Sequence, residues 1–249
     1  MSTVNPYVPP SGPSMSSSAG PPPLVPPQPG SSLDFGRTLT FFFQDPSWVQ
    51  KMLIGSLFTI LSMFLIGSVF VAGYAARLVR RAARGEPHPL PEWDDLGGMF
   101  AEGLSVVGAY LLHLLPVMAA FGILFVPVIL MSERDGDPSP AAALLLVLLV
   151  LLAVVLVFAL LFYFTAAFTR LAMEERFGAA FEVQENLSYL QRNTGNLLMA
   201  LLAFIVSNFI AQFGILLFCV GILPATFWSQ CVGAYALGDV AFRDPGRRV

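Results

Sequence analysis

The chain has 249 residues, of which 56% are hydrophobic and only 12% are charged, and its formal net charge is −3. An ordinary soluble domain has about 25% charged residues. No Asp, Glu, Lys or Arg occurs in the segments 52–76, 103–132, 138–169 and 193–238, and about 20 consecutive apolar residues suffice to cross a bilayer. This composition argues against a soluble enzyme or a nucleic-acid-binding protein and predicts an all-α, polytopic transmembrane helix bundle.

The N-terminal segment 1–33 has a different composition. It carries no charge and contains 10 of the 20 prolines, so it cannot bury enough apolar surface to offset its ordering entropy and is expected to be disordered. We interpret its proline run as a linker, with a polyproline-II ligand for a protein partner as the less favoured alternative. The transmembrane domain is expected to occupy 34–242, followed by a short basic C-terminus at 243–249. Its aromatic beginning, 34–47, fits either the membrane interface or a helix packed on the bundle.

The uncharged segments predict five spans. A single helix over the last segment would measure about 69 Å, far more than a hydrocarbon core of about 30 Å, so this segment must fold back near Gly221 and Pro224. The expected spans lie near residues 52–74, 104–131, 141–168, 197–220 and 222–240.

The distribution of basic residues predicts the orientation. With five spans, ten of the 13 basic residues lie on one side, and Arg37, Lys51 and Arg134 lie on the other. The positive-inside rule then places the C-terminus in the cytoplasm and the protein in the cytoplasmic membrane. A re-entrant first segment, made possible by the glycines at 55, 67 and 73, is a less favoured alternative that would keep both ends inside.

Four arginines follow the first span at helical spacing. Arg77, Arg80, Arg81 and Arg84 are expected to form one basic face on a cytoplasmic extension of the helix. We favour a role in setting the topology, with side chains that snorkel to the interface. Binding of anionic lipid head groups is the alternative.

The segment 90–95 is the most structured polar loop. Pro91 suits the first position of the next helix, Glu92, Asp94 and Asp95 suit its first turns, and Trp93 suits the interface. Ion pairs between these acids and the preceding arginines would lock the loop. Catalysis by paired carboxylates is the less favoured alternative, because no nucleophile, phosphate loop or metal-ligand set accompanies them. The sequence thus predicts no enzyme, no cofactor and no metal.

Apolar residues at 180, 183, 187 and 190 predict a further amphipathic helix after the third span, with Gly195 as its C-cap. Such a helix fits the membrane surface, the underside of the bundle or a protein partner.

Few polar residues lie within the spans. His113, Asn208, Gln212, Ser229 and Gln230 are expected to form hydrogen bonds between helices, and Asn208 and Gln212 should bond across to Ser229 and Gln230. A solute pathway through these residues is the alternative.

The order of several motifs resembles a family of bacterial and archaeal membrane proteins known as domain of unknown function 4013. The motifs are DPSWVQKMLIGS at 45–56, Gly73-Tyr74, Gly85-Glu86, LPEWDD at 90–95, EGL at 102–104, and Gly221 with Pro224. The resemblance covers about 34–242. It implies a multi-pass membrane protein with no assigned activity and supplies no catalytic residues.

The sequence therefore predicts a structural, interaction or lipid-organising membrane protein. Its expected partners are the lipid bilayer, including anionic lipids, and unidentified proteins, but not nucleic acid. A small-solute transporter or channel is the alternative.

Overall fold

The computed structural model describes residues 30–134, 140–216 and 221–246, and all regular structure in these ranges is helical. This confirms the all-α class. The elements are α1 (Phe35–Thr40), the 3₁₀ turn η1 (Phe41–Gln44), α2 (Trp48–Leu61), η2 (Ser62–Phe64), α3 (Ile66–Ala83), α4 (Leu96–Arg134), α5 (Pro140–Glu174), η3 (Phe177–Phe181), α6 (Val183–Gln212), η4 (Phe213–Leu216) and α7 (Ile222–Arg243).

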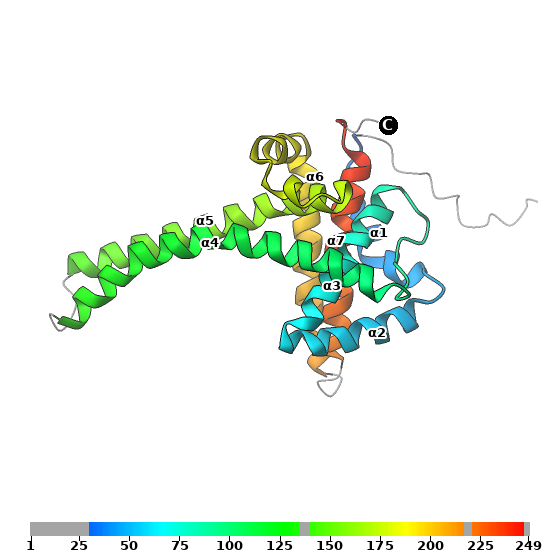
Figure 1. Cartoon of the computed structure of the whole chain (residues 1–249), viewed down its shortest axis with the longest axis horizontal. Helices are drawn as coiled ribbons and strands as arrows, with labels where there is room; N and C mark the ends of the chain where they lie inside the picture. Colours follow the sequence, from blue (N-terminus) through cyan, green and yellow to red (C-terminus); the bar gives the residue numbers. More distant parts are fainter. Residues whose placement is uncertain (1–29, 135–139, 217–220, 247–249) are drawn as a thin grey trace, which may run out of the picture.

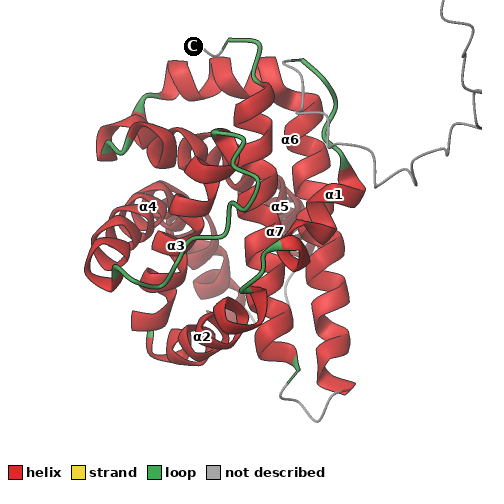
Figure 2. Ribbon diagram, turned by 90° about the vertical axis from the view of Figure 1, so that its right-hand side faces the viewer, coloured by secondary structure: helices red, strands yellow, loops and turns green. Residues whose placement is uncertain are grey.

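Six of these helices form three hairpins, α2–α3, α4–α5 and α6–α7. Figure 1 shows α4 and α5 running side by side out of a body built from the remaining helices. Figure 2 shows α6 and α7 upright beside each other in that body, while α4 is seen nearly end-on. The core follows α3 and α7, whose side chains at Leu78, Phe227 and Val232 are fully buried.

The first expected span is not one helix. α2 ends at Leu61, and Leu65 has a φ of 63° before α3 begins. This left-handed conformation is rare for a residue with a bulky side chain and marks a sharp turn. A Cβ at Gly67 would overlap the carbonyl oxygen of Phe58, so the two helices meet closely beside the turn. The segment 52–74 is therefore part of a short helical hairpin, because backbone can reverse inside an uncharged segment without any polar residue to announce it.

Within the described ranges, length and composition mark three helices as able to cross a membrane, at Leu96–Ile123, Ala143–Glu174 and Val183–Leu216. A fourth is counted if the bent pair Phe35–Gln44 and Trp48–Phe64, which meet at 97°, is one span. The difference from five has two causes. The first span is divided at Leu65, and α7, although long enough, contains too many polar residues, such as Gln230 and Asp239, to meet the same criterion of composition.

The aromatic segment near the N-terminus packs on the bundle. Phe42 is fully buried, and the ring of Phe41 stacks on Tyr235 with centroids 3.9 Å apart. The preceding residues also belong to the fold, because Leu33 is buried and its N–H donates to Asn196 Oδ1 over 3.0 Å. The expected disorder of residues 1–29 and the extreme C-terminus at 247–249 lie outside the described residues.

The amphipathic helix expected near 180–192 and the fourth span are one helix. α6 continues through Gly195, which is therefore not a C-cap. The expected apolar face is not the buried one, because Val183 and Leu187 are exposed. The buried face instead follows Asn186, Tyr189 and Asn193 and continues beyond Gly195 through Leu197, Ala200 and Ala203. Continuous burial outweighs the cost of about 1 kcal/mol for a glycine within a helix.

Candidate functional site

Charged side chains meet where the open ends of the three hairpins come together. We call this set the ion-pair network. It comprises Asp45, Lys51, Arg77, Arg80, Arg81, Glu86, Glu92, Asp95, Glu102, Arg170, Glu174, Glu175, Arg176, Glu182, Asp239 and Arg243. These residues lie at the start of α2, α4 and α6, at the end of α3, α5 and α7, and in the segments just before α2 and after α3 and α5. The Asp239–Arg243 pair is a separate part of the set, because Arg243 bonds to Ser31 and Ser32 and not to the other members.

Arg77 and Arg80 tie the end of α3 to its neighbours. Arg77 Nη2 lies 2.7 Å from Asp95 Oδ2, and its Nε lies 2.9 Å from Glu102 Oε1. Glu102 also pairs with Arg80, whose Nη1 donates to the carbonyl oxygen of Ala172 over 3.2 Å. Two arginines one turn apart thus join α3 to the first turns of α4 and the last turns of α5.

Arg81 folds the following loop back onto α3. Its Nε lies 2.5 Å from Glu86 Oε2, and its other nitrogens donate to the carbonyl oxygens of Leu90 and His88 over 2.6 and 3.0 Å. Arg84 at the end of the same face is exposed. The four arginines share one face at the end of α3, as the spacing predicts. Three of them, however, are already bonded to acceptors within the protein.

The loop 90–95 differs from its expected helical form. α4 begins at Leu96, and Pro91 is a buried loop residue rather than the first residue of the helix. Asp95 is the N-cap, because its Oδ1 accepts from the N–H of Gly98 over 2.9 Å. The Arg77 guanidinium and this backbone bond lower the pKa of Asp95. The capping acid therefore sits before the helix, and Asp94 is an exposed loop residue.

The charge distribution predicts that Lys51 lies on the opposite side of the membrane from Arg77 and its neighbours. The structure shows that this is wrong, because Lys51 lies beside the loop that follows α3. Its ammonium is buried and lies 2.8 Å from Asp45 Oδ2, 2.6 Å from Glu92 Oε1 and 3.1 Å from the carbonyl oxygen of Leu90. Three acceptors match the three donors of an ammonium. Burial raises the pKa of Asp45, but hydrogen bonds from Lys51 and Ser47 outweigh it, so the pKa is lowered. The useful signal was that the only lysine of the chain follows an acid within the 45–56 motif.

Trp93 connects this buried lysine to the α2–α3 hairpin. Its Nε1 donates to the carbonyl oxygen of Lys51 over 3.3 Å, and its ring stacks on Tyr74 and Phe58 with centroids 4.4 and 4.9 Å away. The start of α2 thus lies beside the end of α3, and Trp93 is a packing residue between them.

A second part of the network joins α5 to α6. Arg170 Nη2 lies 2.6 Å from Glu174 and 2.7 Å from Glu182, while Arg176 pairs with the same two acids. The hydrogen bonds from Arg176 and Arg170 lower the pKa of Glu182. Buried Asn186 accepts from Arg170 over 3.1 Å and donates to the Tyr163 hydroxyl over 3.1 Å. From the sequence, Arg170 and Arg176 are expected only to set the orientation of the chain in the membrane.

The cavity beside the basic face has a volume of 350 Å³ and is lined by the four arginines with Pro91, Glu92 and Asp94. The charged lining consists of four cations and two anions, and the residues paired directly with it add one cation and four anions, so five cationic side chains stand against six anionic ones. Most of the positive charge at this cavity is therefore already balanced by protein carboxylates.

The polar residues within the spans do not form one site. His113 Nδ1 lies 2.8 Å from the carbonyl oxygen of Ala109, and Asn208 donates to the carbonyl oxygen of Phe204 in its own helix over 2.9 Å. Gln212 is exposed and Gln230 is partly buried.

The hydrogen bond between α6 and α7 joins different residues from those expected. The hydroxyl oxygens of Ser207 and Ser229 are 2.8 Å apart and buried. The expected bonds from Asn208 and Gln212 to the last helix are therefore replaced by a serine pair, since Asn208 turns its amide to its own backbone.

Among the described residues, no three His, Cys, Asp or Glu side chains are grouped as a metal site would require. No curated protein matches the chain, and no solved structure matches it either. The family described as "Protein of unknown function (DUF4013)" matches residues 56–220, which include the basic face, the 90–95 loop and the α4–α5 hairpin. Because this match covers more than half of the 249 residues, the chain belongs to the DUF4013 family.

Proposed function

We propose that this protein is a multi-pass protein of the cytoplasmic membrane that acts as a structural or interaction unit in contact with lipid, without enzymatic chemistry. One observation carries the proposal. The charged side chains at the open ends of the hairpins mostly satisfy one another, whereas the hairpins themselves expose large apolar side chains such as Leu115, Phe158 and Phe209. A surface of this kind suits hydrocarbon rather than water.

The contacts of the acids in the 90–95 loop favour a structural role for these residues over a catalytic one. Glu92 is bound to buried Lys51, and Asp95 caps α4 while it pairs with Arg77. A general acid or base has to exchange its proton with a substrate. Both acids are instead engaged by protein partners, and the pKa of Asp95 is lowered by Arg77 and by the N–H of Gly98, which suits a structural lock.

The contacts also favour one topology. The Lys51–Glu92 pair brings the start of α2 beside the loop after α3, and the N–H of Gly30 donates to the carbonyl oxygen of Arg243 over 2.9 Å. Both ends of the α2–α3 hairpin, and both ends of the described chain, then lie on one side. In this arrangement α2–α3 is re-entrant, and α4–α5 and α6–α7 each cross the membrane twice.

This topology improves the charge distribution. Ten described basic residues lie on the side of the ion-pair network, and Arg134 lies at the far end of α4. The ten are Arg37, Lys51, Arg77, Arg80, Arg81, Arg84, Arg170, Arg176, Arg192 and Arg243. The positive-inside rule assigns that side to the cytoplasm, and the uncharged N-terminal tail does not have to cross the membrane.

Labelling of single cysteines tests the proposal. In a variant lacking the native cysteines, Ser132→Cys should react with a membrane-impermeant maleimide in intact cells. Glu185→Cys at the start of α6 and Ser17→Cys in the N-terminal tail should react only after permeabilisation. Reaction of Ser17→Cys in intact cells would contradict the re-entrant hairpin. Protection of Ser132→Cys would contradict the orientation.

A further inference from the structure

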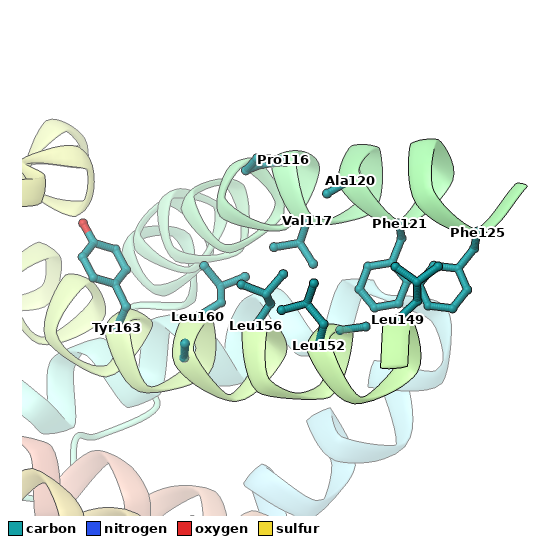
Figure 3. A pocket seen from close by; sticks show the side chains of 12 residues that line it. Pro116, Val117, Ala120, Phe121, Phe125, Leu149, Leu152, Leu156, Leu160 and Tyr163 are labelled. Atoms are coloured by element: carbon teal, nitrogen blue, oxygen red, sulfur yellow. The ribbon is translucent and has the colours of Figure 1, made fainter. Parts of the chain in front are cut away.

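A cavity of 390 Å³ lies between α4 and α5, in the part of the hairpin that leaves the body. Figure 3 shows side chains from Pro116 to Phe125 on α4 facing side chains from Leu149 to Tyr163 on α5. Tyr163 closes one end, and it is the only residue of the lining with a polar side-chain atom. The cavity is therefore a long apolar space with one polar end.

The sequence explains why the two helices leave this space. Ala120, Ala153 and Ala159 lie along it, where larger side chains would fill it. Phe121 and Phe125 stack with ring centroids 5.2 Å apart at the end away from Tyr163 and act as a wall.

The position of the cavity determines what can occupy it. Both walls belong to helices that are long and apolar enough to cross a membrane. Water needs two to four polar partners to occupy a buried site, and the lining offers one hydroxyl. A void of this size would deprive its walls of contacts, so a hydrocarbon chain is the occupant that fits the chemistry of the walls.

The dimensions agree with a lipid chain. From Leu149 to Tyr163, α5 rises by about 21 Å, whereas one leaflet of a hydrocarbon core is about 15 Å thick. The volume also falls within the range of about 300–1,000 Å³ that is usual for small-molecule sites. One acyl chain can therefore lie along the cavity with its ester end at Tyr163.

The polar end shows which head group suits the site. The Tyr163 hydroxyl is linked through Asn186 to Arg170, which lies two turns further along α5. Around Arg170 the network holds two arginines and two glutamates, with Arg176, Glu174 and Glu182 as the other members. This cluster is neutral overall and presents both signs of charge. It is complementary to a head group that itself carries a phosphate and an amine.

We propose that the α4–α5 cavity binds one acyl chain of a zwitterionic phospholipid, whose ester region lies at Tyr163 and whose head group lies over the Arg170–Glu182 cluster. The inference rests on the proposed membrane-embedded function, because it requires α4 and α5 to lie among lipids.

Native mass spectrometry of the full chain tests this inference. The delipidated protein in mild detergent is titrated with a phosphatidylethanolamine and, separately, with a phosphatidylglycerol of the same chains. We expect retention of one phosphatidylethanolamine, with at least fivefold weaker retention of phosphatidylglycerol. The double variant Ala120→Leu/Ala153→Leu fills the cavity and should retain phosphatidylethanolamine at least fivefold more weakly than the unaltered protein.

The matched control is Ala119→Leu, because Ala119 is the exposed neighbour of Ala120 and does not line the cavity. It should retain the lipid as the unaltered protein does. Equal retention by the double variant and the control would overturn the site, and a preference for phosphatidylglycerol would overturn the head-group assignment.

A measurement on the unaltered chain keeps the inference testable if the double variant does not fold. A phosphatidylethanolamine with a photoreactive group in mid-chain should crosslink to cavity residues such as Val117 and Leu160 in vesicles of phosphatidylglycerol, which the site is expected to bind weakly. Crosslinks confined to outward residues such as Val155 would contradict the inference. A chain that inserts normally but retains no lipid contradicts this inference alone, whereas a chain that does not insert contradicts the proposed function.

Discussion

Both halves of α4, residues 96–114 and 115–134, are largely apolar, but they have different surroundings. In the inner half, Met99 and Ala109 are fully buried against the body. In the outer half, Leu115, Met118 and Ile123 expose 57%, 61% and 74% of their surface. The hydrophobicity of a helix therefore reports only the need for an apolar environment. Whether protein or lipid supplies that environment depends on what lies beside the helix.

The same contrast distinguishes whole hairpins. Figures 1 and 2 show α4 and α5 running across the direction of α6 and α7. Helices in membranes tilt by up to about 40° from the normal, so one flat bilayer accommodates both hairpins only if each is strongly tilted. The α6–α7 hairpin is held in the body by buried α7, whereas the outer part of α4–α5 contacts chiefly itself. We therefore expect substitutions to be costly near the body and mild in the outer hairpin.

The largest expected effect comes from a glycine pair that compares the two halves of α4. A Cβ at Gly103 would overlap the carbonyl oxygen of Val69, whereas a Cβ at Gly122 meets nothing within 4 Å. Gly103→Val should therefore separate α3 from α4 and lower the free energy of unfolding by at least about 3 kcal/mol. Gly122→Ala should be neutral or stabilise by about 0.5–1 kcal/mol, as expected for a helix interior. Thermal unfolding in detergent measures both, and similar unfolding temperatures for the two variants would contradict the comparison.

The next effect tests the buried lysine against an exposed arginine. Lys51→Met leaves Asp45 buried without its cation and should cost about 3–5 kcal/mol. Arg84→Met, on the exposed end of the basic face, should change stability by less than about 0.5 kcal/mol. The double variant Lys51→Met/Asp45→Asn should recover part of the loss. Equal stability of Lys51→Met and Arg84→Met would show that the buried pair does not hold the loop.

A smaller effect is expected between α6 and α7. The Ser207–Ser229 bond should contribute a coupling of about 0.6 kcal/mol, the average measured for such bonds between membrane helices. A double-mutant cycle with Ser207→Ala and Ser229→Ala gives this value from unfolding curves. Asn208→Leu should leave it unchanged, because that amide bonds to its own helix. A measurable coupling free energy between Asn208 and Ser229, with none between Ser207 and Ser229, would contradict this prediction and support the hydrogen bond expected from the sequence.

The smallest expected effect is a pH dependence at the ion-pair network. The pKa values of Asp95 and Glu182 are lowered in the folded chain, chiefly by hydrogen bonds from arginines. Carboxylates of this kind stabilise the fold at neutral pH, and the stabilisation is lost as the pH falls below about 4. Asp95→Asn keeps an N-cap acceptor but removes the charge. Its unfolding temperature should lie slightly below that of the unaltered chain at pH 7, and the difference should shrink as the pH falls from about 4 through the lowered folded-state pKa of Asp95. A difference that stays constant as the pH is lowered would contradict an origin in the charge.

Part of the candidate site followed directly from sequence spacing. Arginines at 77, 80, 81 and 84 had to share a helical face, and the acids at 92 and 95 lay near enough in sequence to pair with cations. The spacing could not show that Glu92 pairs with Lys51 rather than with one of the four arginines, because this pair depends on the packing of α2 against the 90–95 loop. Nor could it assign Arg170 and Glu182 to one cluster, since they are joined only by the turn between α5 and α6.

The sequence by itself determined the helical membrane class, the DUF4013 family and the gathering of basic residues at one end of the hairpins. Long uncharged segments leave the backbone few alternatives to helix in an apolar environment. Tertiary structure alone decided that α2 and α3 separate at Leu65, that Lys51 is buried, and that α7 is covered by protein. These features rest on contacts between distant parts of the chain, such as the bond from Lys51 to Leu90, which spans 39 residues. Local patterns cannot specify such pairs, because their free energy depends on which helices become neighbours.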